Sequence, residues 1–182
     1  MRRIVISLWL LTAFAALAQA PAAMWIDVPF VGQPREGCGA ASLSMVMQYW
    51  AGKQRVTPVS TDSDVARIQR ELYSKSEHGI PAERMGQYLK QHGFQAFAFP
   101  GKWSDIEEQI GKGRPLIVAL RPEGQSELHY VVIDGIDPER NLVTMNDPAV
   151  RKLLSEERAR FEKEWSATRN WTLLAVPAKS SH

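Results

Sequence analysis

The chain has 182 residues, of which 45% are hydrophobic and 23% are charged, with one cysteine and four histidines. These values fit one folded domain and exclude disordered, collagen-like and low-complexity chains. One cysteine excludes an intrachain disulfide framework and a cysteine-rich zinc site, and the histidines are too scattered in the sequence to indicate a metal cluster.

The first residues are typical of a secretory signal peptide. A basic start with Arg2 and Arg3 precedes an apolar run over 4–17 and a cluster of alanines, which is the order that such signals have. The apolar run is shorter than the ~20 residues that span a bilayer, so we expect removal of residues 1–18, or 1–20, and no stable membrane insertion afterwards. The mature protein is then predicted to be exported, either periplasmic or secreted.

The charge balance changes when this segment is removed. The whole chain has a formal net charge of +2, with 22 basic and 20 acidic residues, and Arg2 and Arg3 account for the excess. A neutral mature chain gives no net-charge argument for binding nucleic acid or an anionic membrane surface. Because no linker or repeat divides it, we predict a single domain over 24–182.

The first half of the mature chain predicts mainly helices. A short edge strand over 25–30 comes first, because Pro29 is incompatible with a central strand. Apolar residues then recur at helical spacing after Cys38, and Gly52 marks the end of this helix. Two further helices are predicted, one beginning after Thr61 or Asp62 and one over 81–93.

The second half predicts mainly strands, over 94–99, 115–120, 128–136, 142–145 and 171–176. Two short helices are expected among them. One begins at a capping box formed by Ser104 and Glu107, and the other is a charged helix over 155–165. Helices first and an antiparallel sheet second predict an α+β fold, with a helical layer packed on the sheet.

Cys38 has a sequence context that favours chemical reactivity. It lies between Gly37 and Gly39 at the first turn of its predicted helix. A helix N-terminus carries partial positive charge and unpaired N–H groups, which stabilise a thiolate. The flanking glycines let a substrate approach the backbone closely. This context indicates a nucleophile, and a small core residue at a tight turn is the alternative interpretation.

A cysteine nucleophile needs a base, and the base needs a group that orients it. His129 is the candidate base, because it opens a predicted strand whose return strand ends near Asp147. A turn centred near 138–139 places Asp147 opposite His129 to within one or two residues, on the same face of the hairpin. Asn146 could orient the imidazole equally well but points to the other face. A half-buried strand histidine beside a turn aspartate is the structural alternative.

Four segments of the sequence together resemble the C39-like cysteine peptidases. These are papain-like proteins related to the domain that processes bacteriocin precursors after a double glycine. The matching segments are Val28–Gln33, Gly37–Val46, His129–Gly135 and Asn146–Pro148. The resemblance covers essentially the whole mature chain. It implies a papain-like cysteine peptidase fold, in which the helix that begins at the cysteine packs on an antiparallel sheet.

The resemblance also implies a role for each matching residue. Cys38 corresponds to the nucleophile, His129 to the general base and then acid, and Asp147 to the residue that orients the histidine. Gln33 corresponds to the amide that stabilises the oxyanion together with the backbone N–H of Cys38. An amide five residues before the cysteine can fold back to the helix start. The resemblance implies no cofactor and no metal.

Two features of this sequence depart from the processing peptidases of that group. Those enzymes commonly have an acidic residue directly before the cysteine, where this chain has Gly37. They are also fused to membrane and ATPase domains, and this sequence has neither a Walker A motif nor a spanning segment. The predicted export signal argues against processing of double-glycine leaders. The sequence therefore predicts a free-standing, exported peptidase.

The expected reaction is thiol-dependent hydrolysis of peptide or amide bonds, with a peptide or protein as the substrate. Two other functions fit the same residues. One is a cell-wall peptide amidase or an acyl transferase on the same scaffold, because the acceptor is set by the shape of the cleft. The other is a non-catalytic peptide-binding module.

Overall fold

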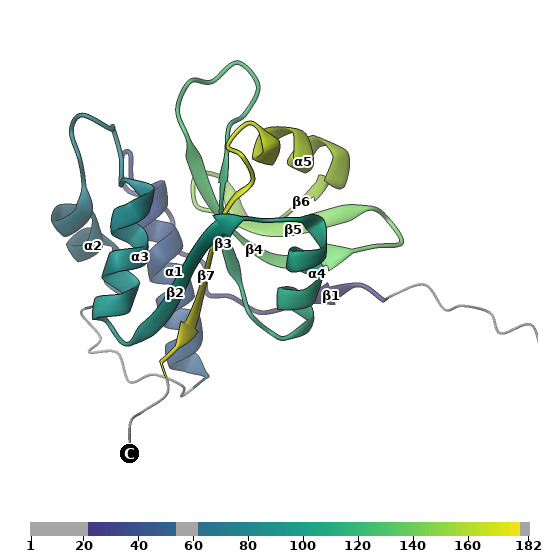
Figure 1. Cartoon of the computed structure of the whole chain (residues 1–182), viewed down its shortest axis with the longest axis horizontal. Coiled ribbons are helices and arrows are strands. Elements are labelled where there is room, and N and C mark those ends of the chain that lie inside the picture. Colours follow the sequence, from purple (N-terminus) through teal and green to yellow (C-terminus); the bar gives the residue numbers. More distant parts are fainter. Residues whose placement is uncertain (1–21, 54–61, 179–182) are drawn as a thin grey trace, which may run out of the picture.

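The structure is a computed structural model, and it describes residues 22–53 and 62–178. Within these residues, five helices and seven strands form an α+β fold in which both faces of one sheet are covered by helices (Figure 1). The predicted signal peptide lies outside the described residues. No helix in the described part combines the length and the hydrophobicity needed to cross a bilayer.

The sheet has the strand order β2-β7-β3-β4-β5-β6, and β1 pairs with β4. All of these pairings are antiparallel. The strands are β1 (Met24–Trp25), β2 (Phe94–Pro100), β3 (Leu116–Leu120), β4 (His129–Asp137), β5 (Leu142–Asp147), β6 (Arg151–Glu157) and β7 (Trp171–Pro177). β3 and β4 are the central strands, and because both of their faces are covered, consecutive apolar residues run through all of β3 and through Tyr130–Ile133 of β4.

Three helices cover one face of the sheet, and two cover the other. On the first face lie α1 (Cys38–Gly52), α2 (Val65–Leu72) and α3 (Ala82–Gln91), and on the second lie α4 (Trp103–Gly111) and α5 (Arg158–Ser166). Helix α1 is the innermost of the first group. It contacts β3, β4 and β7 on one side and α2 and α3 on the other, which explains why most of its residues are buried, Ser42 and Ser44 included.

The alternation of side chains along β4 separates two hydrophobic cores. Tyr130 and Val132 pack in the core under α1, whereas Val131 and Ile133 pack in the core under α4 and α5. Successive strand residues point to opposite faces, so a strand buried on both faces favours consecutive apolar residues, as in Tyr130–Ile133. This rigid double-sided packing fixes the start of β4, where His129 lies.

Strand β6 corrects the predicted helix over 155–165. The chain pairs with β5 as far as Glu157, and α5 begins at Arg158. The strand was missed because its inward positions include Lys152 and Glu156 as well as Leu154, so the apolar alternation typical of a strand is weak. Pairing with the edge of the sheet overrides this weak local preference.

The starts of two helices and the extent of one strand also differ from the sequence prediction. Helix α4 begins at Trp103, and its start is capped by Asp105, which accepts a hydrogen bond from the backbone N–H of Lys102 at 2.7 Å. The predicted capping box of Ser104 and Glu107 is therefore wrong, since Ser104 lies inside the first turn. Helix α2 starts after Asp64. The predicted strand over 25–30 pairs only through its first residues, because the chain leaves the sheet before Pro29.

Asp134 is a buried carboxyl group at a bulge in β4. The register of β4 with β5 shifts between Ile133 and Gly135, and the Asp134 side chain is 0% exposed. Neither of its oxygens has a hydrogen-bond partner in any other described residue. Burial raises the pKa of Asp134 to about 7, and the positive charge of Lys152 opposes this rise without cancelling it. The carboxyl group is therefore protonated in mildly acidic solution.

We expect Asp134→Asn to change how stability depends on pH. The folded chain holds a proton that the unfolded chain loses near pH 4, so the wild type loses stability as pH rises from about 4 to about 7. The shift of roughly three units corresponds to a loss of up to about 4 kcal/mol over that range. Asparagine cannot ionise, so urea unfolding of the variant should lack this slope and show higher stability at pH 8. Parallel pH profiles for the two proteins would contradict this expectation.

Candidate active site

Cys38 is the first residue of α1, and its surroundings require the glycine that precedes it. The backbone N–H of Gly37 donates to the carbonyl of Pro34 at 2.9 Å, which folds the loop tightly against the helix start. A β-carbon on Gly37 would lie 2.5 Å from Cγ of Pro34, so a side chain cannot be accommodated there. No side chain caps α1, so the polar groups of its first turn remain available beside the half-buried sulfur.

His129 and Asp147 form a hydrogen-bonded pair across the β4–β5 hairpin. His129 Nε2 donates to Asp147 Oδ1 at 2.8 Å, and both side chains are largely buried. The register pairs Val132 with Asn146, so Asp147 lies opposite Val131 and diagonally across from His129. Diagonal neighbours share a face. The two side chains therefore meet with an offset of two residues, at the limit of the range that the sequence predicted.

The charge state of this pair follows from opposing effects. Burial alone would lower the pKa of His129, but its hydrogen bonds to Asp147 and Cys38 and the negative charges of both groups raise it to about 9. Burial alone would raise the pKa of Asp147, yet His129 and the backbone N–H groups of Ala149 and Val150 lower it. At neutral pH the pair is therefore an imidazolium and a carboxylate.

The same imidazole lies close enough to Cys38 for the thiol to raise its pKa. Since Nε2 is engaged by Asp147, Nδ1 is the ring nitrogen that remains available to the thiol. A cation beside a cysteine at a helix N-terminus stabilises the thiolate form of the sulfur. The structure thus brings together Cys38, His129 and Asp147, although three helices and two strands lie between α1, which begins at Cys38, and β4, which begins at His129.

Asn146 lies on the opposite face of β5, where its side chain holds neighbouring segments together. Its side-chain amide donates to the carbonyl of Val28 at 3.0 Å, and its oxygen accepts from the backbone N–H of Leu153 at 3.0 Å. Both polar groups of the amide are used to tie the N-terminal segment and β6 to β5. In this arrangement Asp147, and not Asn146, contacts the histidine.

Gln33 lies in the loop before α1 and is attached to the segment that carries the aspartate. Its backbone N–H donates to the carbonyl of Pro148, the residue after Asp147, at 2.9 Å. Its side-chain oxygen is buried and has no hydrogen-bond partner in the described residues. The backbone of Gln33 is thus fixed beside the aspartate, and within the described residues its side-chain amide forms no hydrogen bond to Cys38 or His129.

The remaining histidines have other surroundings. His92 Nδ1 lies 2.7 Å from the carbonyl of Tyr88 at the end of α3, and His78 lies in the loop between α2 and α3. His182 is outside the described residues. Within the described part, no three histidine, cysteine or acidic side chains are grouped closely enough to bind a metal ion.

A family model described as the Peptidase_C39 like family matches residues 25–173. This chain belongs to that family. The match spans β1 to β7 and includes every residue of the site described above. The protein is therefore a C39-like cysteine peptidase with the α+β fold that the sequence resemblance implied.

Solved structures of C39-like peptidases share this fold. A putative C39-like peptidase from Bacillus anthracis aligns with a TM-score of 0.68 and 19% identity, covering 86% of this chain and 98% of the other. The peptidase domain of Streptococcus ComA, a bifunctional ABC transporter, aligns at 0.63 and 22% identity, covering 83% and 99%. A double glycine motif protease from an AMS/PCAT transporter, in complex with its leader peptide, aligns at 0.62 and 20%, covering 85% and 95%. No curated protein matches the sequence.

Proposed function

We propose that this C39-like peptidase hydrolyses peptide or amide bonds with a Cys38–His129–Asp147 triad, and that it acts after export. The observation that carries the proposal is the hydrogen bond between His129 and Asp147, with Cys38 near enough to raise the pKa of the same imidazole. Each member has the neighbour that its role requires, namely a base for the nucleophile and a carboxylate for the base. The proposal of export comes from the basic and apolar sequence over 1–20.

The reaction consists of two acyl transfers. The Cys38 sulfur attacks the carbonyl carbon, the C–N bond breaks, and the imidazolium of His129 gives its proton to the leaving amine. This leaves a thioester on Cys38 and a neutral imidazole. The imidazole then takes a proton from water, whose oxygen attacks the thioester and releases the carboxylic acid and the sulfur. Asp147 remains ionised and stabilises each imidazolium that forms.

Cleavage of a defined peptide mixture tests this proposal. Purified protein should create new peptide termini, and the same protein after alkylation of Cys38 with iodoacetamide should create none. An acyl-enzyme trapped by acid quenching should add the mass of the N-terminal product, less one water, to the tryptic peptide that contains Cys38. Cleavage that survives complete alkylation, or no cleavage of any peptide, would overturn the proposal.

Gln33 is the proposed donor to the oxyanion, together with the backbone N–H of Cys38. A donor of this kind acts on the tetrahedral intermediate, and its loss costs about 10²–10³-fold in kcat. Alkylation of the sulfur by iodoacetamide passes through no such oxyanion. We therefore expect Gln33→Ala to reduce peptide cleavage by roughly that factor while Cys38 alkylates at the wild-type rate. Equal losses in both assays would indicate that Gln33 supports the loop and not the oxyanion.

A further inference from the structure

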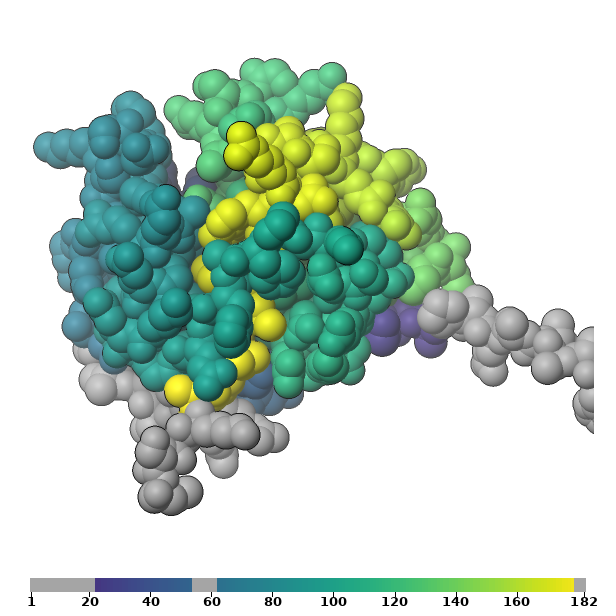
Figure 2. Space-filling view, viewed as in Figure 1, coloured from purple at the N-terminus to yellow at the C-terminus, as the bar shows by residue number. Residues whose placement is uncertain are grey.

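A cavity of about 460 Å³ opens beside the sulfur of Cys38. Two loops form its walls: the α2–α3 loop, which includes Glu77 and His78, and the β3–β4 loop, which includes Glu127. Figure 2 shows these two loops standing apart on the upper edge of the molecule, with the surface hollowed between them. Ile80 and Tyr130 contribute the apolar part of the lining. The cavity is large enough for one or two side chains of a substrate.

Three carboxylates line this cavity, and they come from three separate elements. Glu77 belongs to the α2–α3 loop, Glu83 to the first turn of α3, and Glu127 to the β3–β4 loop. All three are exposed. Within residues 22–53 and 62–178, none of these side chains forms an ion pair or a hydrogen bond. Many carboxylates elsewhere on the surface are paired with Lys or Arg, for example Glu108 with Lys112.

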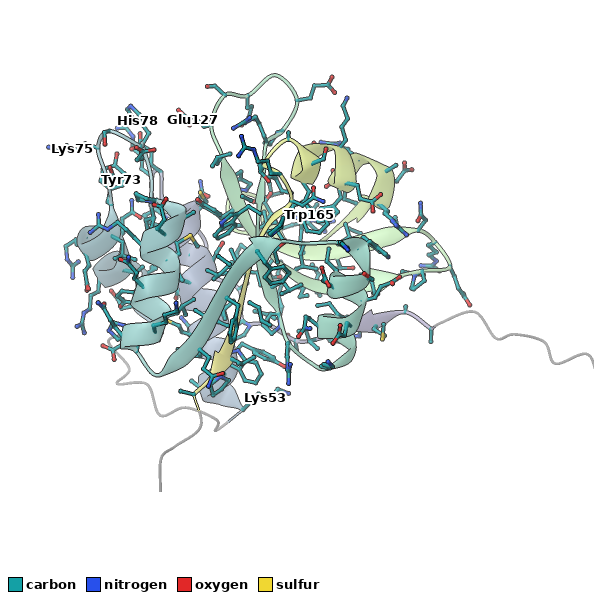
Figure 3. The ribbon with its side chains drawn as sticks, viewed as in Figure 1. Lys53, Tyr73, Lys75, His78, Glu127 and Trp165 are labelled. Carbon is teal, nitrogen blue, oxygen red and sulfur yellow. The ribbon has the colours of Figure 1, made fainter. Side chains whose placement is uncertain are left out.

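No lysine or arginine lines the cavity, and its one titratable nitrogen base is already paired with another carboxylate. His78 lies 3.9 Å from Glu36, and Lys75, on the same loop, extends to the outer side, away from Glu127 (Figure 3). Two of the three carboxylates, Glu77 and Glu83, act on Tyr130, which lines the cavity. Burial first, and then the negative charges of Cys38, Glu83 and Glu77, raise the pKa of Tyr130.

The negative charge is confined to the end of the surface nearest the sulfur. A second cavity, of about 350 Å³, shares Leu128 and Tyr130 with the first and continues away from Cys38. Its charged lining residues are Arg121 and Arg169. The sign of the charge thus reverses along a continuous surface, so a substrate that lies across both cavities meets opposite charges at its two ends.

We propose that the cavity beside Cys38 binds a positively charged group of the substrate, such as a lysine or arginine side chain or a free ammonium group. The proposal rests on thiol hydrolysis at Cys38 and adds the specificity of that reaction. A cation between the three carboxylates gains Coulomb energy from each of them, and its apolar stem can lie against the lining residues Ile80 and Tyr130. An acidic side chain at the same position is repelled by all three carboxylates.

Charged thiol reagents test the proposal without any peptide cleavage. Cys38 is modified with trimethylammonioethyl methanethiosulfonate, which is cationic, and with sulfonatoethyl methanethiosulfonate, which is anionic. Each modification rate is divided by the rate at which the same reagent modifies free cysteine. We expect the ratio of cationic to anionic rates to fall about tenfold when Glu77→Gln, Glu83→Gln and Glu127→Gln are combined. Raising the salt concentration should reduce the wild-type ratio toward that of the variant.

A matched variant controls for the loss of three charges from the whole protein. Glu71→Gln, Glu139→Gln and Glu157→Gln remove the same charge from exposed residues that do not line the cavity, and should leave the ratio unchanged. An equal fall in this control, or no fall in the cavity variant, would overturn the proposal. Comparing the variants, and not the absolute rates, removes the effect of the His129 cation, which is common to all of them.

Peptide cleavage gives the second readout, and it separates the two proposals. The wild type should favour peptides with Lys or Arg within a few residues of the cleaved bond, and the cavity variant should lose that preference by roughly tenfold. If no peptide is cleaved but the reagent ratio behaves as expected, the proposed hydrolysis fails while the cation site stands. If peptides are cleaved without a preference for basic residues, the cation site fails while hydrolysis stands.

Discussion

Peptide cleavage is expected to fall to background in Cys38→Ala, while the fold is retained. The sulfur forms the covalent bond in the proposed reaction, and no other described side chain in contact with His129 is a nucleophile of comparable strength. The side chain is half-buried at the start of a helix, outside the fully packed part of either core. We therefore expect the free energy of unfolding to change by less than about 1 kcal/mol.

The same variant should also change the titration of His129. A negative charge on Cys38 contributes to the raised pKa of His129, so that pKa should fall below about 9 when the charge is removed. NMR titration of the imidazole measures this directly. Cys38→Ser is the matched control, because it keeps a polar side chain of similar size but a much weaker nucleophile. Substantial cleavage by either variant, with the fold intact, would contradict the role of the sulfur.

Replacement of Asp147 is expected to have the second largest effect, and two variants separate its charge from its position. Asp147→Ala removes both the charge and the hydrogen bond to His129 Nε2, and should lower kcat/KM by about 10²–10⁴-fold. Asp147→Asn can still accept a hydrogen bond from the imidazole and from the backbone N–H of Ala149. We expect a loss of roughly tenfold for this variant, since the imidazole stays oriented but loses the stabilisation of its charge.

The pH dependence distinguishes this role from a merely structural one. In the wild type, activity should persist up to the pKa of His129, about 9, and decline above it as the leaving amine loses its proton donor. Both Asp147 variants remove a negative charge that raises that pKa, so the decline should move to lower pH in each. A loss of activity with an unchanged alkaline limit would show that Asp147 acts through stability alone.

The sequence predicted the parts of the site that depend on local pattern. Helix α1 begins at Cys38 and ends at Gly52, because the apolar spacing and the flanking glycines determine both ends. The β4–β5 hairpin was predicted because two apolar strands flank a turn at Pro138, and a hairpin fixes which residues share a face. The bulge at Asp134 could not be predicted, since it depends on packing against β1 and β5.

Other features depend on contacts between distant segments, and no local pattern reports them. Strand β6 forms because the edge of β5 is available, although Lys152 and Glu156 weaken its apolar alternation. The acidic cavity combines Glu77, Glu83 and Glu127, which are unremarkable surface residues in the sequence and meet only when the two loops are brought together. The backbone bond between Gln33 and Pro148 likewise links two loops that are far apart in the chain.

The positions of Cys38, His129 and Asp147 in the chain have a consequence for folding kinetics. His129 and Asp147 are 18 residues apart on one hairpin, so this pair can form as soon as β4 and β5 meet. Cys38 arrives from a different layer across a much longer loop, and closing a longer loop costs more chain entropy and takes more time. We therefore expect the sulfur to reach His129 late in folding, so that the rate of thiol labelling would report the docking of α1 onto the sheet.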